Sequence, residues 1–209
     1  FNISLVSPQF LVIAYYTQNT SYQNLAHRLQ ESLQNFSIPH YIKPIGDLGS
    51  WEKNTHYKAH FILECLEKLD QNLVYVDVDA VFRSFPDLFN TLDCDIAYRT
   101  EDFRWRKDEA LSGTIFLRNN SGVESLVKRW IEINSKIPAE RTKPETWEQK
   151  HMQTAVRENP DIIYYNLPPE YTYIFDHTRS MYPGIRPVIE HFQESRHINK
   201  NQIKNITRR

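Results

Sequence analysis

The stretch Leu73-Val74-Tyr75-Val76-Asp77-Val78-Asp79-Ala80-Val81-Phe82 decides how this chain is interpreted. Two aspartates, two positions apart, interrupt a run of apolar residues of the types that favour strands. A buried carboxylate without a partner costs several kcal/mol, so two of them in such a run need a counter-charge. A divalent cation is the obvious candidate, and hard oxygen ligands favour Mg²⁺ or Mn²⁺.

The spacing of the two aspartates predicts how they would meet a cation. Residues i and i+2 of a strand face the same way, so we expect Asp77 and Asp79 to converge from the end of a strand, with Val78 packed behind them. The alternative is that these two carboxylates cap nearby helices at the strand end.

Strands and helices alternate on both sides of this stretch. Apolar runs predict strands at 10–16, 40–43, 73–82, 95–99, 114–118 and 162–166. Helical spacing of apolar residues predicts helices at 22–36, 51–69, 123–133 and 146–158, with a short helical turn at 85–89. Residues 100–109 show no period and are expected to form a mobile loop. The region after Pro168-Pro169 is expected to be loop-like.

This alternation predicts an α/β sandwich with a mostly parallel central sheet. Ligands of such sheets bind beyond the carboxyl ends of the strands, which is where Asp77 and Asp79 stand. A length of 209 residues suits a single domain spanning 1–209. The late region 167–209 is expected to complete its active site.

Composition excludes several classes of protein. The net charge of −1 argues against binding nucleic acid through a broad basic surface. No apolar run approaches the ~20 residues of a membrane span. No secretory signal is present, so a cytoplasmic location is expected, while a lumenal or secreted one would need a leader already removed from this chain without an initiator Met. Cys65 and Cys94 are expected to be buried free thiols rather than a disulfide.

An apolar strand that ends in Asp-x-Asp resembles the signature of GT-A-fold glycosyltransferases, which use nucleotide-diphosphate sugars. The resemblance implies a GT-A-like, Rossmann-like α/β/α sandwich. It also implies that Asp77 and Asp79 bind Mn²⁺ (or Mg²⁺) and that the metal bridges the donor diphosphate, so that Asp77 belongs to the donor site as well.

Two further segments resemble the donor-binding parts of this family. Ile13-Ala14-Tyr15-Tyr16-Thr17 is similar to the opening strand, whose end surrounds the nucleotide, so Tyr15, Tyr16 and Thr17 are candidate nucleotide contacts. Lys58 lies on the helix where the family often places a cation that reaches the donor. A strand end and a solvated lysine are the ordinary alternatives.

A glycine-containing segment also matches the family. Leu111-Ser112-Gly113-Thr114-Ile115-Phe116-Leu117-Arg118-Asn119 resembles a segment in which a small residue and a glycine enter a strand. Glycine lets the backbone approach a ligand closely, so Ser112 and Gly113 are expected beside the donor sugar or the acceptor. A tight turn is the alternative.

Pro187-Val188-Ile189-Glu190-His191-Phe192 resembles the late segment where retaining members supply a third metal ligand, here His191. A basic residue that meets the diphosphate usually follows, and Arg196 or Lys200 would serve. The family's glycine soon after the histidine is replaced by Gln193-Glu194-Ser195, and an ordinary surface pair of Glu190 with His191 is the alternative.

Many family members have an acidic residue followed by Gln near the start of a helix, facing the donor sugar or the acceptor. Glu148 and Gln149, in Trp147-Glu148-Gln149, are the catalytic candidates here. Helix capping explains an acidic residue there equally well. Asp176 and His177 are alternative candidates.

The resemblance implies a hexosyltransferase that moves a sugar from a UDP-sugar to an unknown acceptor, with the His191 segment favouring retention. Asp-x-Asp also fits haloacid-dehalogenase-like phosphatases, in which Asp77 would be the nucleophile. That motif normally opens its domain, however, and no late paired-Asp motif completes it here. A domain that binds a sugar or a nucleotide without turnover is the non-enzymatic alternative.

Overall fold

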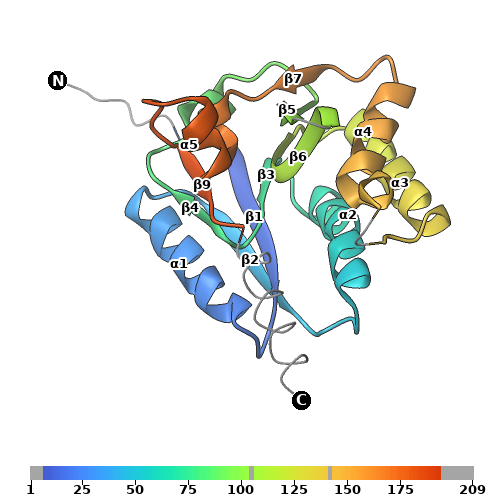
Figure 1. The fold of residues 1–209 in the computed structure, drawn as a ribbon, viewed down its shortest axis with the longest axis horizontal. Helices are drawn as coiled ribbons and strands as arrows, with labels where there is room; N and C mark the ends of the chain where they lie inside the picture. The colour runs from blue at the N-terminus through green and yellow to red at the C-terminus, as the bar shows by residue number, and fades with distance from the viewer. Residues whose placement is uncertain (1–6, 104–105, 141–142, 194–209) are drawn as a thin grey trace.

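The computed structural model describes residues 7–103, 106–140 and 143–193, and in these residues six strands form the main sheet (Figure 1). Their order is β2-β1-β3-β6-β5-β7, with β6 antiparallel to its neighbours and the other pairs parallel. The strands are β1 (Phe10–Thr17), β2 (His40–Ile45), β3 (Asn72–Val76), β5 (Ile96–Phe103), β6 (Arg106–Leu117) and β7 (Tyr164–Asn166). The predicted α/β fold with a mostly parallel sheet is confirmed.

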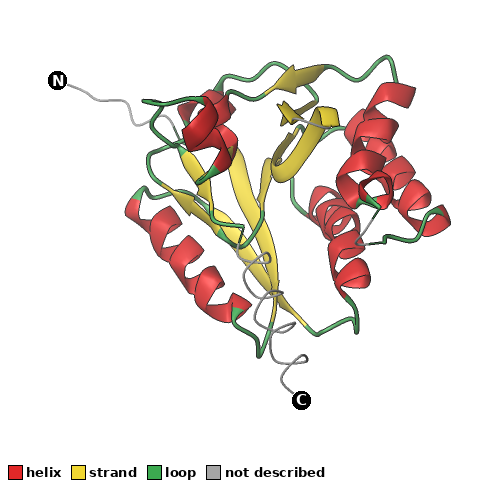
Figure 2. Cartoon of the chain, in the orientation of Figure 1, coloured by secondary structure: helices red, strands yellow, loops and turns green. Residues whose placement is uncertain are grey.

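Helices cover both faces of the sheet, with α1 on one side and α2, α3 and α4 together on the other (Figure 2). The helices are α1 (Tyr22–Asn35), α2 (Trp51–Lys68), α3 (Ser121–Lys136), α4 (Glu148–Glu158) and α5 (His177–Met181), with the 3₁₀ turns η1 (Asp87–Asn90), η2 (Pro144–Thr146) and η3 (Pro169–Thr172). Side-chain caps fix two of the starts, because Ser50 accepts a bond from the amide of Lys53 and Asn120 accepts one from that of Val123.

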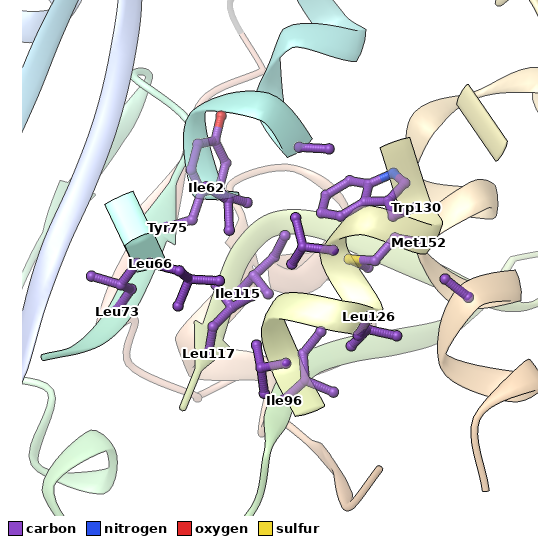
Figure 3. Close-up of a cluster of buried hydrophobic side chains, with 14 of the residues drawn as sticks. Ile62, Leu66, Leu73, Tyr75, Ile96, Ile115, Leu117, Leu126, Trp130 and Met152 are labelled. Carbon is purple, nitrogen blue, oxygen red and sulfur yellow. The ribbon is translucent and has the colours of Figure 1, made fainter. Parts of the chain in front are cut away.

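Strand β3 has apolar side chains on both of its faces. Leu73 and Tyr75 join the core beneath α2, α3 and α4, which Figure 3 shows, whereas Val74 and Val76 join the core beneath α1. Two-sided burial explains why this strand reads as a continuous apolar run. It also places the carboxyl end of β3 at the centre of the fold. Cys65 and Cys94 are buried free thiols, as predicted.

A second sheet has the strand order β4-β9-β8. Its strands are β4 (Ala80–Phe82), β8 (Tyr173–Ile174) and β9 (Ile189–His191). The expectation of one strand over 73–82 is wrong, since β3 ends at Val76 and β4 begins at Ala80 in another sheet. The expectation that the late region is loop-like is also wrong, because η3, β8, α5 and β9 form there.

The expected mobile loop at 100–109 is wrong for its described residues, because β5 extends to Phe103 and pairs with β6, which begins at Arg106. The hairpin has no apolar face to produce a visible period. Its buried positions are instead charged and paired, as Glu101 lies 2.8 Å from the Arg99 guanidinium and accepts a bond from Tyr182. Strand β2 likewise continues past its predicted end through Pro44, which an edge strand tolerates.

Within the described residues, no helix combines the length and the apolar character needed to cross a bilayer.

Stability should depend on pH through His151, which is 2 % exposed and lies with Nδ1 2.7 Å from Oδ1 of Asn134. Burial, with a smaller contribution from His56, lowers the pKa of His151 from 6.5 to about 4. Between about pH 6.5 and pH 4, His151 is therefore protonated in the unfolded chain but not in the folded one. The stability that is present above pH 6.5 is lost as the pH falls through this range. We expect a loss of about 1–2 kcal/mol between pH 7 and pH 5.

Urea unfolding at both pH values measures this loss. The control is His151→Gln, which removes the titrating group but leaves the carboxylates that also titrate in this range. An equal loss in the variant and the wild type would contradict the prediction.

Candidate active site

A cleft of about 540 Å³ lies beyond the carboxyl ends of β1 and β3. This volume is in the range of ligand sites, roughly 300–1,000 Å³. Every candidate site residue within the described residues lines it: Tyr15, Tyr16, Thr17, Lys58, Asp77, Asp79, Ser112, Gly113, Glu148, Gln149 and His191. Arg196 and Lys200 lie outside the described residues. The alternatives Asp176 and His177 are not among the lining residues.

The two aspartates occupy a turn rather than a strand. The amide of Ala80 donates to the carbonyl of Asp77, which closes a four-residue turn between β3 and β4. Strand alternation is therefore the wrong explanation for their approach, although Val78 is buried as expected. The carboxylates are accessible from the cleft, with side chains 42 % exposed for Asp77 and 15 % for Asp79.

His191 reaches this turn through the second sheet. Strand β9 pairs with β4 so that His191 lies opposite Ala80, the residue after Asp79. Its ring is buried, with Nδ1 3.5 Å from Oδ1 of Asp79 and Nε2 2.8 Å from Oγ1 of Thr114. Residues more than a hundred positions apart in sequence thus meet at one point.

Gly113, on β6, faces the side chains of His191 and Asp77. Its carbonyl accepts a bond from the amide of Asp77. A Cβ at this position would lie 3.2 Å from Cε1 and 3.3 Å from Nδ1 of His191, and 3.4 Å from Oδ2 of Asp77. The absence of a Cβ at Gly113 thus leaves room for His191 and Asp77, and the approach of Gly113 to a donor sugar or an acceptor stays a prediction.

Gly113→Ala should displace the His191 ring by a few tenths of an ångström while leaving the strand intact, because the backbone there is not in the left-handed region. We expect weakened binding of Mn²⁺ by the folded variant, with a stability loss of about 1–3 kcal/mol from overpacking. Calorimetric titration with Mn²⁺ and urea unfolding measure the two effects. Gly46→Ala is the control, since nothing lies within 4 Å of its added Cβ. Unchanged Mn²⁺ binding in Gly113→Ala would contradict the prediction.

Lys58 contacts three other residues that line the cleft, Asp77, Ser112 and Glu148. Its ammonium lies 2.8 Å from Oε1 of Glu148, 3.2 Å from Oδ1 of Asp77, and 3.0 and 3.2 Å from the two oxygens of Ser112. The Ser112 hydroxyl donates in turn to Glu148 at 2.6 Å. Four oxygens thus surround a group with three hydrogens. A contact between Lys58 and a donor phosphate stays a prediction.

This network contains two carboxylates, Asp77 and Glu148, but one cation, Lys58. Burial lowers the pKa of Lys58, but the charges of Asp77 and Glu148 outweigh it and raise the pKa overall, so the ammonium stays protonated. Burial also raises the pKa of Glu148, against the opposing effect of Lys58. Both raised pKa values fit an arrangement in which two carboxylates, Asp77 and Glu148, share the single cation of Lys58. Glu148 is the more buried of the two carboxylates, and its Oε2 has no hydrogen-bond partner within the described part of the chain.

Tyr75 and Tyr15 line the cleft from β3 and β1. The Tyr75 hydroxyl donates to Oδ1 of Asp77 at 2.9 Å, and the Tyr15 hydroxyl donates to the carbonyl of Asn54 at 2.7 Å. The Tyr15 ring packs edge-on against Tyr57 and Phe61. Sequence reasoning did not single out Tyr75, although it stands two positions before Asp77.

The β5–β6 hairpin supplies a wall that sequence reasoning missed. The Arg106 guanidinium lies over the rings of Phe103 (5.3 Å) and Trp147 (5.7 Å) and contacts Glu109 at 3.3 Å. Gln149 donates to the same carboxylate at 2.7 Å. Lys150 lies 3.2 Å from the other Glu109 oxygen without hydrogen-bond geometry, so that contact is ionic only.

The side chains of Asp77, Asp79 and His191 are chemically suited to bind a divalent cation, since carboxylates and an imidazole nitrogen are ligands of Mn²⁺ and Mg²⁺ sites. Within the described residues, no three His, Cys, Asp or Glu side chains are already arranged to hold a metal ion. Neighbouring donors of an octahedral Mg²⁺ with bonds of about 2.1 Å lie about 3.0 Å apart. The 3.5 Å between Oδ1 of Asp79 and Nδ1 of His191 is close to that spacing.

Comparisons with known proteins identify the family of the chain. Residues 47–193, more than half of the chain, match the family described as nucleotide-diphospho-sugar transferase. No curated protein matches the chain.

Two of the similar solved structures are glycosyltransferases. One is involved in the glycosylation of the major capsid of PBCV-1, with a TM-score of 0.64 and 13% identity over 89% of this chain and 93% of that one. The other is the apo form of GlyE from Streptococcus pneumoniae TIGR4, with a TM-score of 0.64 and 12% identity over 89% of this chain. The chain covers 55% of the GlyE length. At these identities the likeness shows a shared fold.

Proposed function

The chain belongs to the nucleotide-diphospho-sugar transferase family, and on that premise we propose that it moves a hexose from a UDP-sugar to an acceptor hydroxyl, with retention and with Mn²⁺ (or Mg²⁺) bound. Asp77, Asp79 and His191 would hold the cation. The donor would lie along Tyr15, Tyr16 and Thr17 towards Ser112 and Gly113. Family membership also favours this reaction over the phosphatase alternative.

The balance of charge in the cleft is the observation that supports the cation. The lining carries four carboxylates, of Asp77, Asp79, Glu109 and Glu148, against the cations of Lys58 and Arg106. The carboxylates of this lining thus outnumber its Lys and Arg cations by two, and Lys58 is shared between Glu148 and Asp77. A donor diphosphate, itself an anion, would be repelled by that excess. A divalent cation at the turn removes the repulsion.

When bound, such a cation acts as a Lewis acid that offsets the charge developing on the leaving diphosphate. In the reaction, the bond from the anomeric carbon to the diphosphate oxygen breaks, and its electron pair leaves with the diphosphate. The acceptor oxygen forms the new bond on the same face of the sugar. The acceptor's proton passes to the departing diphosphate oxygen on that face.

Retention therefore needs no separate carboxylate base. This suits Glu148, whose Oε1 is already occupied by Lys58 and Ser112. Glu148 and Gln149 would instead orient the sugar and stabilise developing charge from the cleft wall.

A thermal-shift panel of nucleoside diphosphates and nucleotide sugars, each with and without Mn²⁺, tests the proposal. We expect uridine diphosphate and one UDP-sugar to raise the melting temperature only when Mn²⁺ is present. A shift of equal size without Mn²⁺ would contradict the proposed role of the cation. A shift with a nucleotide of a different base would contradict the proposal that the donor is a UDP-sugar. Tight binding without any cleavage of the donor would favour the non-catalytic alternative.

A further inference from the structure

The two ring nitrogens of His191 face different surroundings. Nδ1 points to the turn, 3.5 Å from Oδ1 of Asp79 and 3.3 Å from the position of a Cβ on Gly113. Nε2 points away from it and lies 2.8 Å from the hydroxyl of Thr114. The ring is 3 % exposed and Thr114 is fully buried, so water cannot substitute for the hydroxyl.

A neutral imidazole carries one proton, so one ring nitrogen donates and the other accepts. A cation at Nδ1 needs the lone pair there, which puts the proton on Nε2. That N–H then requires a buried acceptor. Without the cation, the better arrangement is the opposite one, in which Nδ1–H faces the Asp79 carboxylate and Nε2 accepts a hydrogen bond.

A hydroxyl serves both arrangements, because it accepts from Nε2–H in one and donates to Nε2 in the other. We propose that Thr114 is a positioning residue that holds the His191 ring and lets its proton move between Nδ1 and Nε2 as a divalent cation binds or leaves. The inference rests on the cation site of the proposed function.

The placement of Thr114 suits this role. It lies on β6 opposite Val76, the last residue of β3, so its backbone is fixed in the sheet one position from Gly113 and beside the aspartate turn. A hydrogen bond of this kind orients a metal-binding histidine in many proteins, and its loss typically lowers metal affinity by 10–100-fold.

Matched substitutions at Thr114 test the role. Thr114→Val keeps the shape but removes the hydroxyl, whereas Thr114→Ser keeps the hydroxyl. Titration of the whole chain with Mn²⁺, followed by the electron paramagnetic resonance of the free ion, gives the affinity. We expect a loss of about 10–100-fold in Thr114→Val and recovery in Thr114→Ser. Equal affinity of Thr114→Val and wild type would overturn the inference and leave the cation site standing. Absence of Mn²⁺ binding in the wild type would overturn the cation site and the inference together.

A measurement on the wild type removes any dependence on how the variants fold. Long-range ¹H–¹⁵N spectra report which nitrogen of His191 carries the proton. We expect the Nδ1–H form without a cation and the Nε2–H form in saturating Mg²⁺. The same tautomer under both conditions would overturn the proposed exchange.

Discussion

Asp79→Asn is expected to lose Mn²⁺-dependent release of nucleoside diphosphate from the donor by about 100-fold or more, which corresponds to several kcal/mol of transition-state stabilisation. The amide has nearly the shape of the carboxylate but lacks the negative charge that a cation requires. Asp79 lies in a turn with its side chain partly exposed, so the fold should survive. Initial rates across a range of Mn²⁺ concentrations measure the effect.

The control for this variant is Asp93→Asn, which makes the same chemical change on a fully exposed side chain outside the cleft. It should keep the wild-type rate. Equal rates for Asp79→Asn and Asp93→Asn would show that Asp79 takes no part in the Mn²⁺-dependent reaction.

Lys58→Met is expected to destabilise the fold by about 3–5 kcal/mol, the typical cost of removing one partner of a buried ion pair. The variant leaves Glu148, 4 % exposed, and Asp77 without their shared cation. Protonation of Glu148 would relieve part of this cost, so the loss should be smaller at pH 5 than at pH 8. Urea unfolding at the two pH values measures it.

Two further variants make this test specific. Lys58→Met combined with Glu148→Gln should recover much of the lost stability, because the uncompensated charge is gone and Ser112 keeps a partner. Lys68→Met removes an exposed pair with Glu64 and should cost no more than about 1 kcal/mol. A loss in Lys58→Met no greater than in Lys68→Met would show that the buried network contributes little.

The sequence was sufficient for the fold class and for most of the helices. Apolar periodicity is strong wherever a helix or strand buries a continuous face, as β3 does on both sides. The hairpin around Glu101 and Glu109 escaped prediction because its buried positions carry charges instead of apolar side chains. Two of their hydrogen-bond partners, Tyr182 and Gln149, are distant in sequence and leave no local pattern.

The candidate residues within the described part of the chain all line the cleft, but the sequence indicated neither how they meet nor the wall formed by Phe103, Arg106 and Glu109. Asp77 and Asp79 approach through a turn between two sheets, which the apolar run concealed because β4 follows β3 so closely. The part played by Thr114 depends on the pairing of β6 with β3 and of β9 with β4. Those pairings join residues far apart along the chain, so no spacing motif reveals them.

The most direct measurement of the central claim is cleavage of nucleotide sugars by the whole chain, assayed with Mn²⁺ and with a chelator. A panel of nucleotide sugars is incubated with the wild type and with Asp79→Asn, and released nucleoside diphosphate is quantified beside phosphate released from an aryl phosphate. The account predicts Mn²⁺-dependent release of uridine diphosphate by the wild type, none by Asp79→Asn, and no phosphate from the aryl ester. Intact donors under every condition, or phosphate released from the aryl ester, would contradict it.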